Sequence, residues 1–307
     1  MGRVSPKTLA AAGMSLLLVA ALLGFFLREG PKHRPAAAPP VTTTVAPPPP
    51  TTTVAPPPPT TTAPPPPPKP IPMSFENGGA IVVHTHDADP VWLGQQLRAA
   101  GFGWVAVDLA ADDPPDLGWI ERFEQASGLA VGGWSVLGDD PKADASYVAS
   151  QIQLNGLSFY IADAEAPYQA DPARSQQFVD AFRAAEPGLA AGLSSLCDAA
   201  GIGLTAWANA GFDFLPQAYV NDFGSGVDPA VCVHAAAPWF PASRVHPTVG
   251  SYHGQRGWFA PGRYVRLLAQ AGTTGFSVYP AETAMTAQGW QTYGSAITSL
   301  HIAARPG

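Results

Sequence analysis

Short apolar runs rich in Val, Ile and aromatic residues alternate with segments of helical periodicity along residues 73–307. Apolar runs of this length, bounded by turn residues, predict buried strands. Eight such runs occur, at residues 80–86, 104–109, 129–137, 157–165, 189–196, 212–221, 246–253 and 274–282. Their starts lie roughly 23 to 34 residues apart, which is the length of a strand-helix unit with a right-handed crossover.

Helices are expected between most of these runs, at residues 90–100, 117–127, 144–154, 173–185, 262–270 and 288–300. The segments after the fifth and sixth runs carry the weakest helical signal. Eight alternating units predict an α/β protein with a single (β/α)8 TIM-type barrel. An open doubly wound sheet is the alternative. No Gly-x-Gly-x-x-Gly follows the first run, where a dinucleotide-binding sheet carries it, so the barrel is preferred and no cofactor is indicated.

The amino-terminal part has a different pattern. Residues 9–27 contain no charged residue, and a run of about 20 apolar residues is long enough to cross a bilayer as a helix. No small-x-small cleavage site follows the run directly, so residues 1–30 are read as an uncleaved transmembrane anchor in preference to a signal peptide. This predicts membrane association through residues 9–27.

Residues 31–72 are almost wholly Pro, Thr, Ala and Val, and the unit Thr-Thr-Thr-Val-Ala-Pro-Pro-Pro-Pro occurs at residues 42–50 and again at 51–59. Such a segment cannot bury a core and is expected to be an extended, disordered stalk. Stalks of this composition hold a domain away from a surface and are targets of O-glycosylation. We therefore expect the barrel domain, residues 73–307, to lie outside the cytoplasm, either tethered or, if the leader is cleaved, secreted.

The charge and the cysteine content of that domain exclude some classes of partner and metal site. Residues 73–307 carry ten Lys and Arg against 22 Asp and Glu, a formal net charge of −12. A surface this acidic excludes nucleic acid as a partner, because nucleic acid needs a basic footprint. The chain has two cysteines, Cys197 and Cys232, too few for a closed zinc site of four thiolates. A disulfide between them is one alternative, but their spacing in the sequence cannot establish it. Two buried free thiols are the favoured alternative.

The strongest chemical signal is the run Leu157-Ser-Phe-Tyr-Ile-Ala-Asp-Ala-Glu165. Residues two apart in a strand point to the same face, so Asp163 and Glu165 are expected to emerge together. Two acids beside an apolar strand are unfavourable unless they reach a cleft. The pattern indicates a hydrolytic site.

In a barrel the active site lies at the carboxyl ends of the strands. Acids, amides and aromatic residues dominate the ends of the eight runs. The expected substrate-binding residues are His84, His86, Asp108, Trp134, Gln217, Tyr219, Asn221, Tyr252, His253, Tyr279 and Glu282. Carbohydrate sites have this composition, because sugar faces stack on aromatic rings, sugar hydroxyls need donors and acceptors, and glycosidic cleavage needs carboxyl groups.

A barrel whose fourth strand ends in Asp163-Ala-Glu165 resembles the TIM-barrel glycoside hydrolases, in particular the family 25 lysozymes and, more distantly, the family 18 chitinases. The resemblance implies that Glu165 is the proton donor and that Asp163 stabilises the developing charge or orients a substrate acetamido group. Gln217-Ala-Tyr219 is similar to the position at which chitinase-like barrels place a substrate-contacting tyrosine. The first run departs from the pattern, since Val83-His-Thr-His86 stands where family 25 enzymes place an aspartate.

Other readings of these residues stay open. Asp163 and Glu165 could cap the following helix or pair with Arg174. His84 and His86 resemble the first-strand ligands of metal-dependent barrels, yet the fifth and sixth runs supply no further histidine at their ends. Trp239 and Trp258, which lie among Pro and Gly, are candidate sugar platforms, whereas Trp134, Trp207 and Trp290 are ordinary core candidates.

These observations lead to one principal hypothesis and two alternatives. The principal hypothesis is a membrane-tethered, extracytoplasmic glycoside hydrolase acting on peptidoglycan or another cell-envelope or extracellular polysaccharide, with Glu165 and Asp163 as catalytic residues and no metal. The first alternative is a non-catalytic carbohydrate-binding barrel. The second is a metal-dependent hydrolase that uses His84 and His86.

Overall fold

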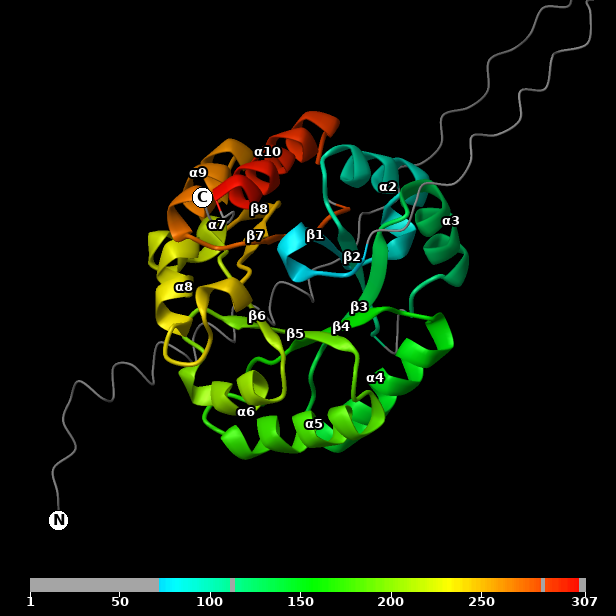
Figure 1. The fold of residues 1–307 in the computed structure, drawn as a ribbon, viewed down its shortest axis with the longest axis vertical. Coiled ribbons are helices and arrows are strands. Elements are labelled where there is room, and N and C mark those ends of the chain that lie inside the picture. The colour runs from blue at the N-terminus through cyan, green and yellow to red at the C-terminus, as the bar shows by residue number, and fades with distance from the viewer. Residues whose placement is uncertain (1–71, 111–113, 283–284, 304–307) are drawn as a thin grey trace, which may run out of the picture. The chain divides into compact units, whose positions relative to one another are not determined.

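The computed structural model describes residues 72–110, 114–282 and 285–303. Within them, eight parallel strands close into one barrel in the order β1-β10-β7-β6-β5-β4-β3-β2 (Figure 1). The barrel strands are β1 (Gly79–Val82), β2 (Trp104–Asp108), β3 (Ala130–Val136), β4 (Phe159–Asp163), β5 (Ala190–Leu196), β6 (Asp213–Gln217), β7 (Thr248–Gly250) and β10 (Ser277–Tyr279). The predicted (β/α)8 barrel is confirmed, and the open doubly wound sheet is wrong.

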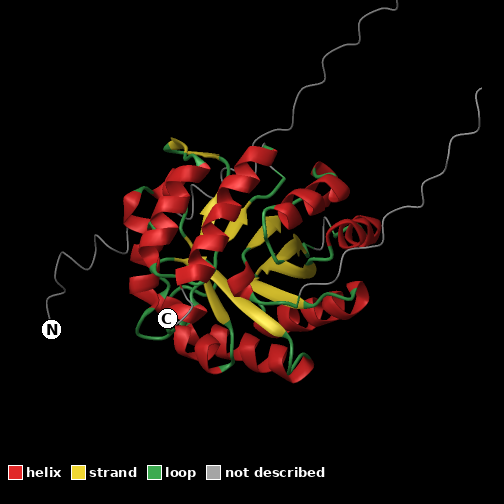
Figure 2. Ribbon diagram, turned by 45° about the horizontal axis from the view of Figure 1, so that its top comes forward, coloured by secondary structure: helices red, strands yellow, loops and turns green. Residues whose placement is uncertain are grey.

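Helices surround the strands on the outside of the barrel (Figure 2). They are α2 (Pro90–Ala99), α3 (Leu117–Ser127), α4 (Pro141–Asn155), α5 (Pro172–Ala185), α6 (Leu204–Asn209), α7 (Val220–Phe223), α8 (Pro229–Ala236), α9 (Pro261–Ala271) and α10 (Ala287–Ala303). The six predicted helices are present. The weak signal after the fifth and sixth strands corresponds to short helices, because α6, α7 and α8 divide those connections into small pieces.

The dipeptide Asp-Pro starts four of these helices. In α2, α4, α5 and α8 the aspartate side chain accepts a hydrogen bond from a backbone N–H of the first turn, and the proline is the first helical residue. Proline suits that position because its fixed φ is helical and its missing N–H would have had no helical partner. A repeated local signal therefore sets where helices begin after strands β1, β3, β4 and β6.

The barrel interior is filled by large side chains that pack against glycines. Trp104 at the start of β2 and Phe159 at the start of β4 are fully buried, with ring centroids 5.3 Å apart. A Cβ atom on Gly79 would lie 2.1 Å from the Trp104 ring, and one on Gly132 would lie 2.5 Å from the Phe159 ring. The glycines thus make room for the two aromatic rings, as close packing of an interior requires.

Phe75 closes the amino-terminal opening of the barrel. It lies in the short 3-10 helix η1 (Phe75–Asn77), and its ring makes edge contacts with Trp104 at 5.5 Å and Phe159 at 5.7 Å. The ring also stacks on that of the buried His246, which precedes β7. Phe75 therefore joins the starts of several strands that are distant in the sequence.

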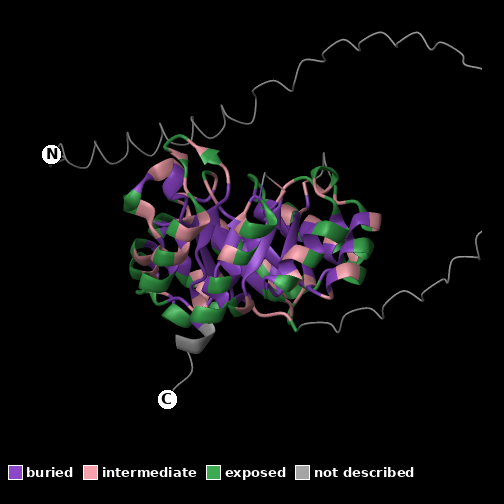
Figure 3. Cartoon of the chain, turned by 90° about the horizontal axis from the view of Figure 1, so that it is seen from above, coloured by how far each residue is buried: buried purple, intermediate pink, exposed green. Residues whose placement is uncertain are grey.

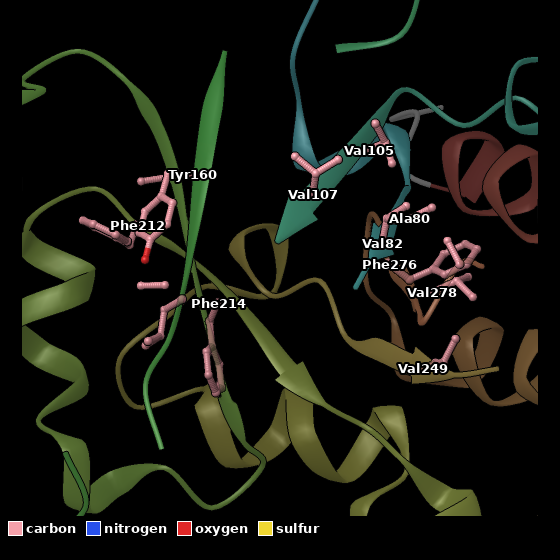
Figure 4. Packing of buried hydrophobic residues seen from close by; sticks show 14 of the residues in the cluster. Ala80, Val82, Val105, Val107, Tyr160, Phe212, Phe214, Val249, Phe276 and Val278 are labelled. Atoms are coloured by element: carbon pink, nitrogen blue, oxygen red, sulfur yellow. The ribbon is translucent and has the colours of Figure 1, made fainter. Parts of the chain in front are cut away.

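A second, larger apolar layer lies between the strands and the helices. Figure 4 shows part of it, including Val82, Val107, Phe214 and Val278, which come from four different strands. In Figure 3 the buried strands occupy the centre, and exposed residues lie on the outer faces of the helices. All described residues belong to one compact unit.

Two sequence expectations need correction in the fold. The run at residues 246–253 is not one strand: β7 ends at Gly250, and residues 253–258 form a separate antiparallel hairpin of β8 (His253–Gly254) and β9 (Gly257–Trp258). Cys197 and Cys232 form a disulfide, so the favoured free thiols are wrong. The predicted anchor and stalk lie outside the described residues, and among the described helices none is long and apolar enough to span a membrane.

The disulfide ties the end of β5 to α8. Both sulfur-bearing residues are buried and cluster with Ala218, which directly follows the last residue of β6. The cross-link closes a sequence separation of 35 residues. It therefore supports the segment that carries Gln217 and Tyr219.

Replacing Phe75 by Ala should lower the free energy of unfolding by about 3–5 kcal/mol, because it leaves a cavity among buried aromatic rings. Urea denaturation followed by circular dichroism measures the change. Leu154→Ala, at a side chain 69% exposed on α4, is the control and should change stability by less than about 0.5 kcal/mol. A Phe75→Ala protein as stable as the control would contradict the assigned role.

Removing the disulfide with the double substitution Cys197→Ala and Cys232→Ala should cost about 2–4 kcal/mol of stability, since the unfolded chain regains the freedom of the closed loop. The same denaturation experiment measures it, under oxidising conditions. A thiol assay on the unfolded, unreduced wild type gives an independent check. Two reactive thiols in that assay would show that the bond is absent.

Candidate active site

Asp163 and Glu165 meet at the carboxyl end of β4. Asp163 is the last residue of the strand and is buried, with 8% of its surface exposed, whereas Glu165 is half-buried. The side-chain amide nitrogen of Gln217 donates to both, at 3.1 Å to Asp163 Oδ1 and 2.8 Å to Glu165 Oε1. The expectation that the two acids emerge together is confirmed.

The neighbouring strands supply the polar groups around this pair. In the parallel register, Asp163 on β4 lies beside Ser194 on β5, and Leu196 on β5 lies beside Gln217 at the end of β6. The Gln217 amide nitrogen lies 3.4 Å from Ser194 Oγ as well. Three consecutive strands thus hold the two carboxyls and their shared donor in one place.

The environment of Asp163 favours its protonated form. Burial raises the pKa of the Asp163 carboxyl well above its usual range, and the charge of Glu165 raises it further. The hydrogen bonds from Ser194 and Gln217 lower the pKa and only partly offset these effects. Two adjacent carboxyls in a desolvated site ionise one at a time. Asp163 can therefore hold a proton and donate a hydrogen bond.

Four aromatic rings lie at the carboxyl ends of β3, β6, β7 and β10. Tyr219 stacks on Tyr279 at 5.6 Å, and Tyr252 makes edge contacts with both, at 6.0 and 6.2 Å. Trp134 lies edge-on to Tyr279 at 6.0 Å and donates its indole N–H to the Val82 carbonyl. Burial raises the pKa of all three tyrosines, so each keeps a neutral O–H group. The structure brings these four predicted residues together.

Asn221 lies behind this cluster. It is buried in α7, where its side-chain nitrogen donates to the Tyr252 carbonyl at 3.1 Å and its oxygen accepts from Tyr264 Oη at 2.7 Å. The neighbouring Asp222 accepts from Tyr252 Oη. Asp222 was missed in the sequence because the apolar run at 212–221 was read as one strand. The strand ends at Gln217, so residues 218–223 turn and bring Asp222 to the site.

The β1 side of the barrel end carries Glu282, Asp108 and two histidines. Glu282 Oε1 accepts from the backbone N–H groups of Val83 and His84, and its buried Oε2 has no hydrogen-bond partner among the described residues. Burial raises the pKa of the Glu282 carboxyl, and those backbone hydrogen bonds oppose the shift. Asp108 ends β2, and its Oδ1 accepts from Ala110 N. The charge of Asp108 also contributes to the raised pKa of Asp163, so the acids of this side act on the Asp163 pair.

His84 and His86 lie exposed beyond the end of β1, around the 3-10 helix η2 (Thr85–Asp87). Their rings stack on each other with centroids 5.2 Å apart. No group of three or more His, Cys, Asp or Glu side chains that could hold a metal ion occurs in the described part of the chain. His253 is exposed in β8, outside the aromatic cluster.

The capping and ion-pair readings of the two acids are wrong. Helix α5 is capped by Asp171, not by Asp163 or Glu165. Arg174 lies 3.2 Å from Asp139 and 3.3 Å from Asp171. The carboxyls of Asp163 and Glu165 therefore remain directed toward the barrel end.

Comparison with known proteins identifies similar folds. No protein-family model matches the chain, and no curated protein matches its sequence. Among solved structures, a chitinase from Chromobacterium violaceum is 16% identical with a TM-score of 0.52, covering 74% of this chain and 99% of its own. The catalytic domain of a hyperthermophilic chitinase from Pyrococcus furiosus is 11% identical with a TM-score of 0.55, covering 78% and 98%.

A third similar structure is the spore cortex-lytic enzyme SleL of Bacillus cereus, 10% identical with a TM-score of 0.53 and covering 71% of this chain and 73% of its own. At these identities the likeness shows a shared TIM-barrel fold. The chitinase side of the sequence resemblance is thereby supported at the level of architecture. The resemblance to family 25 lysozymes stays a prediction.

Replacing Asp163 by Asn should stabilise the protein at neutral and higher pH. The folded-state pKa of Asp163 is raised above the unfolded value, so the wild type loses stability as pH rises through the folded pKa. The gain in melting temperature should be largest at pH 8 and shrink toward about pH 4, near the unfolded aspartate pKa. Thermal unfolding across this range measures it, with Asp198→Asn as an exposed control. A gain that does not change with pH would contradict the raised pKa.

Proposed function

We propose that this protein is a glycoside hydrolase acting on N-acetylated polysaccharide of the chitin or peptidoglycan type, with Glu165 as proton donor and Asp163 as its partner. The observation that carries the proposal is the sharing of one amide donor, Gln217, by two carboxyls at the carboxyl end of a parallel barrel. Active sites in such barrels lie at this end. The chitinases and the cortex-lytic enzyme with similar folds support the same reaction class.

The two carboxyls suit different steps of glycosidic cleavage. The pair holds one proton, which rests on Asp163 before reaction. In the proposed reaction this proton passes to the half-buried Glu165, which donates it to the leaving oxygen as the bond to the sugar C1 breaks. Asp163, which lies deeper and is then ionised, accepts a hydrogen bond from the acetamido N–H, and the acetamido carbonyl oxygen of the same sugar bonds to C1. Water then attacks C1 and displaces that oxygen, and Glu165 takes the proton that the water loses.

The distance between the carboxyls favours retention of configuration. Asp163 Oδ1 and Glu165 Oε1 lie 3.1 and 2.8 Å from one nitrogen, so these oxygens can be no more than 5.9 Å apart. Inverting enzymes separate their two carboxyls by about 6.5–9.5 Å to admit a water molecule. The pair is thus too close for an inverting mechanism of that kind. The acetamido-assisted route proposed above also retains configuration, and it does not depend on the carboxyl spacing.

The aromatic cluster supplies the sugar contacts in this proposal. Tyr219, Tyr252, Tyr279 and Trp134 supply aromatic rings near the acid pair, and Tyr219 and Tyr279 add neutral O–H groups, as expected for a carbohydrate site. His84, His86, Asp108, His253 and Glu282 are proposed to contact more distant parts of the glycan. Asn221 and Asp222 act by holding Tyr252.

The proposal includes an extracytoplasmic location, tethered through residues 9–27 and extended by the stalk at 31–72. Disulfides form and persist in oxidising compartments. The Cys197–Cys232 bond therefore supports export of the barrel domain. A tethered hydrolase of this kind would act on polysaccharide of the cell envelope or its surroundings.

Replacing Glu165 by Gln in the full-length protein should reduce turnover of chitin oligosaccharides or peptidoglycan strands by at least about 100-fold, because general acid catalysis contributes that much. Binding should remain, since the substitution keeps the shape of the side chain and removes only its acidic proton. Product release followed by chromatography measures turnover, and Glu121→Gln on α3 is the exposed control.

Each other outcome of this experiment has a distinct meaning. Full activity in Glu165→Gln would exclude Glu165 as the acid. A wild type that binds these glycans without cutting them would identify a carbohydrate-binding barrel. Activity that disappears on chelation and returns with zinc would instead favour the metal-dependent alternative. A wild type that neither binds nor cuts them would overturn the proposed function.

A further inference from the structure

A cavity of about 290 Å³ lies outside the acid pair and the tyrosine cluster, between the β8–β9 hairpin and the first turns of α9 and α10. Its lining residues are Trp258, Pro261, Gly262, Met285, Thr286, Gln288, Gly289 and Thr292. None of these described lining residues is charged. A cavity with this lining suits a neutral ligand.

The chemistry of the lining is that of a sugar subsite. Trp258 exposes 43% of its surface, which is large for a tryptophan at the edge of a cavity. Gln288, Thr286 and Thr292 belong to the same lining. Thr292 Oγ1 donates to the Gln288 carbonyl and can still accept, and Thr286 Oγ1 accepts from Gly289 N and can still donate. An aromatic face beside a few neutral hydrogen-bonding groups is how proteins recognise the apolar face and hydroxyls of a sugar ring.

The hairpin connects this cavity to the aromatic cluster of the candidate active site. Tyr252, whose ring contacts Tyr219 and Tyr279, immediately precedes β8. The next residue, His253, is the cross-strand partner of Trp258. A single short hairpin thus leads from the tyrosines to the tryptophan platform.

The same hairpin is fixed to helix α7. Gln255 N donates to Asp222 Oδ1 at 2.7 Å, and Arg256 N donates to the Asn221 carbonyl at 2.8 Å. Gly254 packs so closely that a Cβ atom there would lie 2.5 Å from the Asn221 carbonyl oxygen. Asn221 and Asp222 also hold Tyr252. The platform and the tyrosine cluster are therefore held by one network.

We infer that this cavity is a distal subsite that binds a further sugar of the same neutral glycan whose scissile bond lies at Asp163 and Glu165. The inference rests on the proposed function and extends it from the type of bond to the length of the substrate. Glycans too short to reach from the acid pair to Trp258 bind through the central site alone. Longer glycans gain the tryptophan stacking and the hydroxyl contacts.

The structure offers two independent ways to disable the subsite. Trp258→Ala removes the platform. Gly262→Leu adds a side chain to the cavity wall, and its Cβ has room, because beyond the adjacent residues and the helix backbone it would meet only Thr292 Cγ2, at 4.0 Å. Trp92→Ala is the matched control, since Trp92 on α2 is 42% exposed and does not line the cavity.

The test is a titration of chitin oligosaccharides of increasing length, from the disaccharide upward, by calorimetry. All variants are made in the full-length chain carrying Glu165→Gln, so that the ligands are not cut, and thermal unfolding verifies that each is folded. Both cavity variants should bind short oligosaccharides as the parent does and lose about tenfold in affinity for long ones, as removal of an aromatic anchor typically costs. Trp92→Ala should bind every length normally.

The remaining outcomes separate the two proposals. If the parent binds more tightly with length and both cavity variants keep that gain, the distal subsite is wrong and the proposed function stands. If affinity falls equally at every length, the cavity supports the central site only, and the subsite is again wrong. If the parent binds no oligosaccharide, the failure lies with the proposed function, and the subsite falls with it.

Discussion

The central constraint in this structure is electrostatic: two carboxyls, one on the last residue of β4 and one two residues beyond it, occupy the same poorly solvated end of a barrel. Two negative charges there repel each other and lose hydration, so they need a shared donor and a proton. Gln217 supplies the donor from β6, and the raised pKa of Asp163 favours the proton. Much of the surrounding structure holds Gln217 in position, including the register from β4 to β6 and the disulfide packed on Ala218.

The position of the aromatic cluster also depends on hydrogen bonds from polar groups, in this case those that hold Tyr252. Tyr252 comes from the loop after β7, which has no regular strand to fix it at that point. Buried polar groups hold it instead, through Asn221, Asp222 and the hydroxyl of Tyr264. Such networks are rigid when every member is satisfied. The ring that would contact substrate is therefore only as well placed as the polar groups behind it.

The sequence predicted what depends on periodicity and little of what depends on strand ends. Alternation along residues 157–165 placed Asp163 and Glu165 on one face, and the spacing of eight apolar runs predicted the barrel.

The features that were not predicted depend on where strands end and how helices pack. The run ending at Asn221 has the pattern of a strand, although the chain turns after Gln217, and Asp222 was therefore not identified. Nothing in the spacing of Cys197 and Cys232 distinguished a disulfide from two thiols, because their approach is set by how α8 packs near β5. The hairpin that carries Trp258 was not predicted either, because its strands are only two residues long and leave no periodic pattern in the sequence.

Phe75 also shows at which end of the barrel the described part of the chain begins. Its carbonyl packs against Gly275, just before β10, and its ring contacts the first residues of β2 and β4, so residue 72 lies at the amino-terminal opening. Asp163 and Glu165 lie at the other opening. Residue 72 and the candidate acid pair therefore lie at opposite ends of the barrel. Under the proposed tethering, the point at which the tether joins the barrel would be separated from the site by the full length of the strands, so the tether would not begin beside the bound glycan.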